Sequence, residues 1–133
     1  MPQVDYQRQN RAKYLIVYHL IFVVKYRKPL LTQYGPRIKE LLQYIADKSD
    51  FAIQEMEVDR DPVHMMVLSQ PKLSPAQIVR RLKAESTRLI WQEHPELKKE
   101  FWKKHVFWSD GYFCGSIGNA SIETVKQYIE SQG

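Results

Sequence analysis

The pattern of apolar and polar positions divides the chain into segments typical of strands and of helices. Residues 14–26, YLIVYHLIFVVKY, are β-branched and aromatic almost throughout, which predicts a central strand covered on both faces. Two more apolar runs, 51–58 and 63–68, are separated by the turn sequence DRDP at 59–62. This arrangement predicts a β-hairpin.

Two longer segments have the spacing of amphipathic helices. Gly35 and Pro36 are predicted to open the first, because the apolar residues after them recur at i, i+3, i+4 and i+7: Ile38, Leu41, Leu42 and Ile45. The second runs over 74–93. Ser74 is its predicted N-cap, Pro75 occupies the first helical position and Gln77 can close a capping box.

The remaining segments complete an α+β pattern. Residues 96–104 suit a short helical turn, 105–118 an irregular strand pair, and 121–132 a last amphipathic helix. The order predicts a ferredoxin-like (RRM-like) antiparallel sheet with helices packed on one face. We expect one domain over 1–133, in which the polar residues 1–12 are loosely held.

Charge and cysteine content restrict the class of protein. The formal net charge of +5 favours a polyanionic partner such as nucleic acid. The single cysteine, Cys114, excludes an intrachain disulfide and fits a reducing compartment. The N-terminus has no long apolar region, and the run LIVYHLIFVV is too short to cross a bilayer. We therefore expect a cytoplasmic protein with no membrane partner.

Three segments taken together resemble a known family. They are HLIFVVKYRKP at 19–29, DRDPVHMMVLSQP at 59–71 and FWSDGYFCGSIGNASIETVKQYIESQ at 107–132. Their residues, order and spacing are similar to those of the insertion sequence 200/605 transposases, the single-tyrosine class of His-hydrophobic-His nucleases. The resemblance covers nearly the whole chain, and its most specific part is WSDGYF followed by ETVKQYIESQ.

The resemblance implies a metal-dependent enzyme that cuts and rejoins single-stranded DNA at hairpin-marked element ends. In that family two histidines of one strand and a glutamine of the last helix hold a divalent ion, and a tyrosine one turn earlier attacks the DNA. These roles map onto His64, Gln132 and the nucleophile Tyr128, while Pro62 stands where the first histidine is expected. The implied product is a 5′-phosphotyrosine link with a free 3′-OH, which allows rejoining without ATP.

The spacing of these residues fits the implied site. Tyr128 and Gln132 are four apart and share a helix face, and positions 62 and 64 share a strand face. If the last helix packs across that strand, His64 and Gln132 can meet over one ion, for which Mn²⁺ suits the ligands better than Mg²⁺. No other cofactor is expected.

Three replacements for the missing histidine are open. Asp61 is a hard oxygen ligand, which a bend at the proline can bring round to the site. His19, central in the first strand, is another candidate, although its environment also suits a structural histidine. Water is the third, and the sequence favours Asp61 or water.

The expected DNA contacts are basic. Lys25, Arg27 and Lys28 suit the phosphates and Tyr26 suits base stacking, and Lys83 is a further candidate on the second helix. The resemblance also implies a homodimer, in which Tyr128 serves its own subunit or the other. Two rival hypotheses are a catalytically degenerate nucleic-acid-binding module of the same fold and an interaction domain unrelated to DNA.

Overall fold

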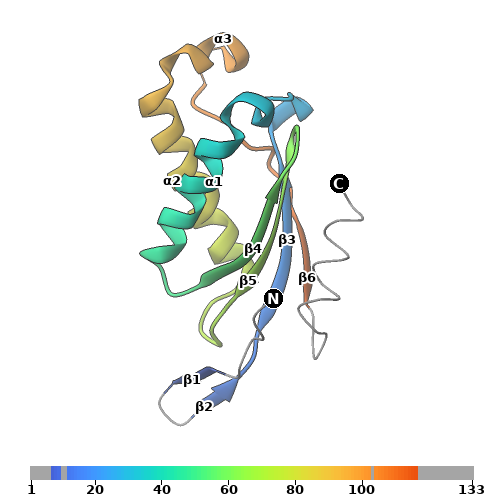
Figure 1. Cartoon of the computed structure of the whole chain (residues 1–133), viewed down its shortest axis with the longest axis vertical. Helices are drawn as coiled ribbons and strands as arrows, with labels where there is room; N and C mark the ends of the chain where they lie inside the picture. The colour runs from blue at the N-terminus through green and yellow to red at the C-terminus, as the bar shows by residue number, and fades with distance from the viewer. Residues whose placement is uncertain (1–6, 10–11, 103, 117–133) are drawn as a thin grey trace.

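The computed structural model describes residues 7–9, 12–102 and 104–116, and in this part of the chain a βαββαβ unit follows a short ribbon (Figure 1). The elements are β1 (Gln7–Gln9), β2 (Ala12–Tyr14), β3 (Val17–Val23), α1 (Leu31–Asp47), β4 (Ala52–Val58), β5 (Pro62–Leu68), α2 (Pro75–Glu93), α3 (Lys98–Phe101) and β6 (Phe113–Ser116). Two 3-10 turns, Lys25–Arg27 and Pro95–Leu97, follow β3 and α2.

The main sheet has the strand order β4-β5-β3-β6, and every neighbouring pair is antiparallel. Helix α1 connects β3 to β4, and α2 lies in the connection from β5 to β6. This is the ferredoxin-like arrangement. Figure 1 shows α1 and α2 side by side on one face of the sheet. The predicted α+β class, with helices packed on one face, is confirmed.

The core lies between the sheet and the two helices. Alternate residues of β3 and β5 point into it, because successive side chains of a strand face opposite ways. The side chains of Leu20, Phe22, Val63, Met65 and Val67 are at most 1% exposed, and they belong to one cluster with Ile38, Leu42, Leu82 and Ile90. Burial of each such side chain contributes about 1.5–3 kcal/mol. The intervening residues of β3 and β5 therefore face away from α1 and α2.

Helix α1 begins one turn earlier than the sequence predicted. It starts at Leu31, whose N–H donates to the carbonyl of Arg60 at 3.0 Å, and Pro36 lies inside it. Gly35 does not open the helix but lets it approach β4, since a Cβ there would lie 3.0 Å from Cγ1 of Val58. The expectation that Gly35 and Pro36 open this helix is wrong, because contacts with the β4–β5 turn set its start.

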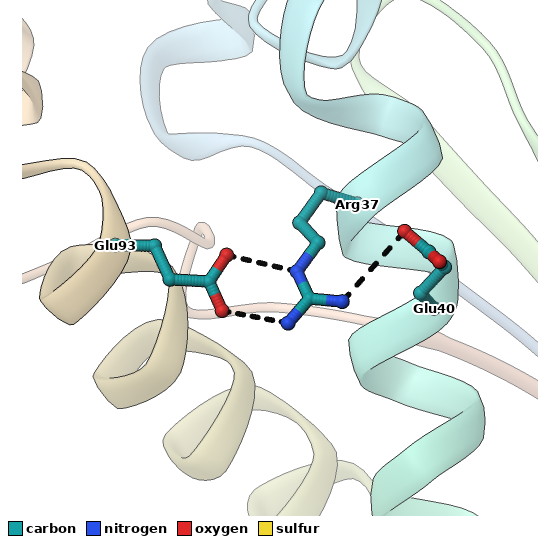
Figure 2. Close-up of polar contacts among 3 residues, drawn as sticks. All are labelled: Arg37, Glu40 and Glu93. Carbon is teal, nitrogen blue, oxygen red and sulfur yellow. Dashed lines mark hydrogen bonds and ion pairs between the residues drawn. The ribbon is translucent and has the colours of Figure 1, made fainter.

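Helix α2 begins where the sequence predicted. The main-chain N–H of Gln77 donates to Oγ of Ser74 at 3.1 Å, and the N–H of Ser74 donates to Oε1 of Gln77 at 2.8 Å. Figure 2 shows how this helix is joined to α1. Arg37 donates to both carboxylate oxygens of Glu93, each at 2.8 Å, and its third contact is Glu40 at 3.7 Å. This fork raises the pKa of Arg37 and lowers the pKa of Glu93.

The predicted strand over 14–26 is divided in the structure. Its first residue belongs to β2, which pairs with β1 in a ribbon that includes part of the segment expected to be loosely held. Its end forms the 3-10 turn Lys25–Arg27, in which Tyr26 and Arg27 have φ of 61° and 54°. Of the predicted strand pair over 105–118, the described part contains β6 and a single bridge between Val24 and Trp108. The predicted last helix, 121–132, lies outside the described residues.

Candidate active site

The candidate site lies on the sheet face turned away from α1 and α2. His64 and Met66 of β5 point to this face, because Val63, Met65 and Val67 point into the core. A second, small cluster on this face joins Met66 to Val17, with Leu15 and Leu68 at its margin. His64 thus sits beside apolar packing in the middle of the sheet.

His64 is a buried imidazole without a hydrogen bond in the described part of the chain. Its side chain is 4% exposed, and neither Nδ1 nor Nε2 has a partner there. Burial lowers the pKa of the ring, while the negative charges of Glu57 and Asp59 oppose that shift. Glu57 is the register partner of His64 on β4. A neutral imidazole with free nitrogens is the form that binds metal ions.

The ring of His19 lies beside that of His64 on this face. The two centroids are 6.3 Å apart with 20° between the ring planes. Phe113 of β6 packs edge-on against His19, with centroids 5.5 Å apart. Burial, and to a lesser extent the charge of His64, lowers the pKa of His19 to about 4. At neutral pH both imidazoles are therefore uncharged.

Asp61, in the turn before β5, has its hydrogen-bond partners in the segment that follows β3. Arg27 donates from Nε to its carboxylate, and the N–H of Val24 donates to its main-chain oxygen at 2.9 Å. The contact with Asp61 raises the pKa of Arg27. The structure thus gives the Asp61 carboxylate a cation as partner.

An exposed corner whose positive charge is partly neutralised follows β3. It consists of Lys25, Tyr26, Arg27 and Lys28. The Tyr26 ring is 68% exposed, and Nζ of Lys25 lies 5.7 Å from its centroid. The charges of this corner have acidic neighbours: Lys25 lies 3.7 Å from Asp110, and Lys28 lies 3.2 Å from Glu100. Because Tyr26 and Arg27 both have left-handed backbone conformations, the Tyr26 ring points away from the core. It is therefore available for stacking.

Lys83 on α2 is half-buried, and its hydrogen bonds hold the segment after Trp108 against this helix. Its ammonium donates to the carbonyls of Ser109 and Gly111 and lies 5.8 Å from the centroid of Tyr112. Burial lowers its pKa, and Asp110 opposes that shift. Two of its three N–H groups are thus used inside the protein.

A hollow of about 520 Å³ lies between α2 and residues 105–112. Its lining combines cationic and aromatic side chains, among them Arg80, Lys83, His105, Trp108 and Tyr112. The wall is fixed by Trp108, whose indole N–H donates to Oγ of Ser86 at 2.9 Å, and by Trp91, which donates to the carbonyl of Val106 at 2.8 Å.

Tyr128 and Gln132, the predicted nucleophile and amide ligand, lie outside the described residues. Over 7–9, 12–102 and 104–116, no three His, Cys, Asp or Glu side chains gather closely enough to hold an ion. In the same ranges no helix has the length and apolarity needed to cross a membrane. Of the predicted site residues, the structure brings Asp61 together with Arg27. Lys83 binds the carbonyls of Ser109 and Gly111 instead.

Sequence reasoning gave too little weight to two residues. It named His19 only as one of three replacements for the missing histidine, beside a structural role, and it did not place His19 on the face of His64. It also passed over Trp102, which follows α3 with a φ of 60° and is 85% exposed. An aromatic residue within a lysine-rich stretch, KKEFWKK, was the available signal.

Comparisons with known proteins agree on one family. The family described as "Transposase IS200 like" matches residues 12–132. The ISDra2 transposase TnpA of Deinococcus radiodurans is 31% identical over 120 residues, which cover 90% of this chain and 85% of the relative. The transposase for insertion sequence element IS200 of Salmonella typhimurium is 26% identical over 118 residues, covering 86% and 75%.

Solved structures share the fold. A crystal structure of a candidate transposase from Deinococcus radiodurans superposes with a TM-score of 0.76 at 28% identity, covering 95% of this chain and 97% of that one. A REP-associated tyrosine transposase, solved bound to a REP hairpin, has a TM-score of 0.60 at 14% identity and covers 94% and 67%.

Proposed function

Since the chain belongs to the family of IS200-like transposases, we propose that it nicks single-stranded DNA at hairpin-marked ends and transfers the cut strands. The observation that carries this proposal is the buried, neutral His64, whose ring nitrogens have no hydrogen-bond partner in the described ranges. An unpaired buried imidazole costs about 1–3 kcal/mol of stability. That cost is explained if the ring serves as a ligand.

The donor at His64 fits a divalent cation. We assign His64 and Gln132 as ligands of Mn²⁺ or Mg²⁺, the former suiting an imidazole better. A bound cation would supply electrostatic stabilisation of the phosphate undergoing attack. Asp61, the third ligand that the sequence favoured, is less suited to this role because Arg27 already occupies its carboxylate.

Tyr128 is assigned as the nucleophile. Its phenolic oxygen bonds to the phosphorus, the bond from phosphorus to the 3′-oxygen breaks, and the proton lost by the phenol is balanced by the one gained on that oxygen. The product is a 5′-phosphotyrosine link and a free 3′-OH. Attack by another 3′-OH reverses the step and joins a new pair of ends without ATP.

We assign DNA binding to the corner after β3. Lys25, Arg27 and Lys28 meet backbone phosphates and Tyr26 stacks on a base. Hairpin binding is proposed by analogy with the structural neighbour, 14% identical, that was solved bound to a REP hairpin. Lys83, with one N–H remaining, contributes less than the sequence suggested.

The working assembly in this proposal is a cytoplasmic homodimer. A dimer brings two DNA ends together, as strand exchange requires. Tyr128 acts beside His64 of its own subunit or of the second one. Mixing two inactive variants, His64→Ala and Tyr128→Phe, separates these arrangements, because only shared sites regain activity in the mixed dimer.

A nicking assay tests the proposal. A pool of 3′-labelled, hairpin-bearing single strands is incubated with the full chain and Mn²⁺, because the 5′-phosphotyrosine link keeps the 3′ fragment on the protein, and protein–DNA adducts that survive SDS are counted. We expect adducts with the wild type and with the control Tyr112→Phe, and none with Tyr128→Phe. Adducts that persist undiminished in Tyr128→Phe would rule out the assigned nucleophile.

One observation favours a second candidate, a binding module of the same fold that no longer cuts. Pro62 opens β5 where the family has a histidine, so the strand offers one imidazole instead of two. This candidate predicts no adduct under any ion. It also predicts tight DNA binding whose affinity falls steeply with salt concentration.

A further inference from the structure

The strand pairing brings a second imidazole, that of His19, to the sheet face that carries His64 and Pro62. In the antiparallel register of β3 and β5, Ile21 is opposite His64 and His19 is opposite Met66. His19 is therefore the diagonal neighbour of His64, on the same face and one strand away. Pro62 pairs with Val23, so residue 62 lies on one side of the His64 ring and His19 lies on the other.

The separation of the two rings suits a shared ion. A metal bonded at about 2.1 Å to one nitrogen of each imidazole holds the ring centroids roughly 4.6–6.5 Å apart, depending on the bond angle. The observed separation is 6.3 Å. A tetrahedral angle then needs the ring centroids to approach by roughly 1 Å and a 90° octahedral angle by roughly 1.7 Å, and the near-parallel rings must turn so that their nitrogens converge.

The surroundings of the pair also suit a ligand role. The side chains of His19 and His64 are 2% and 4% exposed, so an ion between them is shielded from water. Phe113 packs edge-on against His19 and restricts its ring plane. The alternative ligand, Asp61, has its carboxylate engaged by Arg27.

We propose that His19 supplies the imidazole that Pro62 lacks, so that one divalent cation is held by histidines from two neighbouring strands. This inference rests on the metal-dependent function proposed above and names the second ligand of that site. Two imidazoles favour Mn²⁺, Co²⁺ or Zn²⁺ over Mg²⁺.

The test is Mn²⁺ affinity measured by calorimetry on the full chain. His19→Ala is expected to weaken binding by at least about tenfold. Adding Pro62→His to that variant is expected to restore most of the affinity, because a histidine at 62 shares the face of His64. The matched control is His94→Ala, since His94 contacts Tyr34 and Glu96 at the edge of the helices and should leave the affinity unchanged. Unchanged affinity in a folded His19→Ala would overturn the assignment.

A second measurement needs no variant. Zn²⁺, which is diamagnetic, is added to the wild type while the imidazole ¹⁵N shifts, which report direct coordination, are followed by NMR. Coordination shifts at both His19 and His64 support the shared ion, and a shift at His64 without His19 contradicts it. If DNA adducts form but the His19 signals do not respond to the ion, only this inference fails. If both rings bind the ion and no adduct forms, the proposed enzyme fails and the site stands.

Discussion

The ammonium of Lys83 on α2 donates hydrogen bonds to the main-chain oxygens of Ser109, at 2.7 Å, and Gly111, at 2.8 Å. This clamp fixes the segment between the bridge at Trp108 and strand β6, which brings Phe113 to His19. A lysine predicted from sequence as a DNA contact thus stabilises the approach to the candidate site.

Lys83→Met, which keeps the aliphatic stem and removes the donors, is expected to lower the free energy of unfolding. The loss should be about 1–3 kcal/mol, because two carbonyls lose a charged donor. Urea denaturation measures it. Arg80→Met, one turn away and exposed, is the matched control and should leave the midpoint unchanged. Equal midpoints for both variants would contradict the clamp.

Ser86 and Trp108 are expected to behave as a coupled pair. Oγ of Ser86 accepts the indole N–H of Trp108 and donates to the carbonyl of Leu82 at 2.6 Å, all within the core. Ser86→Ala leaves a buried N–H unpaired and should cost about 1–3 kcal/mol. In Trp108→Phe, which has no N–H, the same serine change should cost clearly less. A double-mutant cycle that shows simple additivity would argue against the coupling.

The corner after β3 should determine the salt dependence of DNA binding. Lys25→Ala combined with Lys28→Ala is expected to reduce the slope of log K against log [NaCl] by about 1.4, because each phosphate contact on a single strand contributes about 0.7. Fluorescence anisotropy over a range of NaCl concentrations measures the slope. The control, Lys39→Ala on α1 with Lys48→Ala at its C-cap, removes equal charge elsewhere. If both double variants change the slope equally, binding follows net charge and not this corner.

The metal-free protein should lose stability in mild acid because of His19. Its pKa is 6.5 in the unfolded reference and about 4 in the fold. Between these values the unfolded chain binds a proton that the folded chain does not, so stability is full above pH 6.5 and declines towards pH 4. The loss from this ring is at most about 3 kcal/mol.

Urea unfolding with EDTA at pH 7, 6, 5 and 4.5 measures this decline. His19→Leu provides the comparison, and its curve should be flatter over the same interval. His64, which faces His19 from β5 and also has a lowered pKa, contributes to the remaining slope. Identical pH profiles for the wild type and His19→Leu would show that the ring does not stay neutral in the fold.

Local signals in the sequence were sufficient for part of the fold. The capping box of Ser74 and Gln77 lies within three residues, so α2 could be placed at its first turn. The start of α1 could not, because it depends on a hydrogen bond from Leu31 to Arg60, which is distant in sequence. The division of the predicted first strand likewise depends on a distant contact, because the main-chain N–H of Lys25 donates to the carbonyl of Phe107.

The candidate site was partly predictable for a similar reason. His64 was recognised from its motif, but the face occupied by His19 was not readable from apolar alternation, because β3 and β5 are buried on both faces. Only the register of the two strands brings the rings together. The structural role of Lys83 was hidden for the same reason, since its partners are carbonyls of a distant segment.

The most direct test of the account is to locate the DNA-linked residue. The adduct formed with Mn²⁺ is digested with nuclease and trypsin, and cleavage after Lys126 releases residues 127–133, QYIESQG, in which Tyr128 is the only tyrosine. We predict by mass spectrometry that this peptide carries a nucleotide 5′-phosphate on Tyr128. A nucleotide found on any other peptide, or an unmodified 127–133 in purified adduct, would contradict the account.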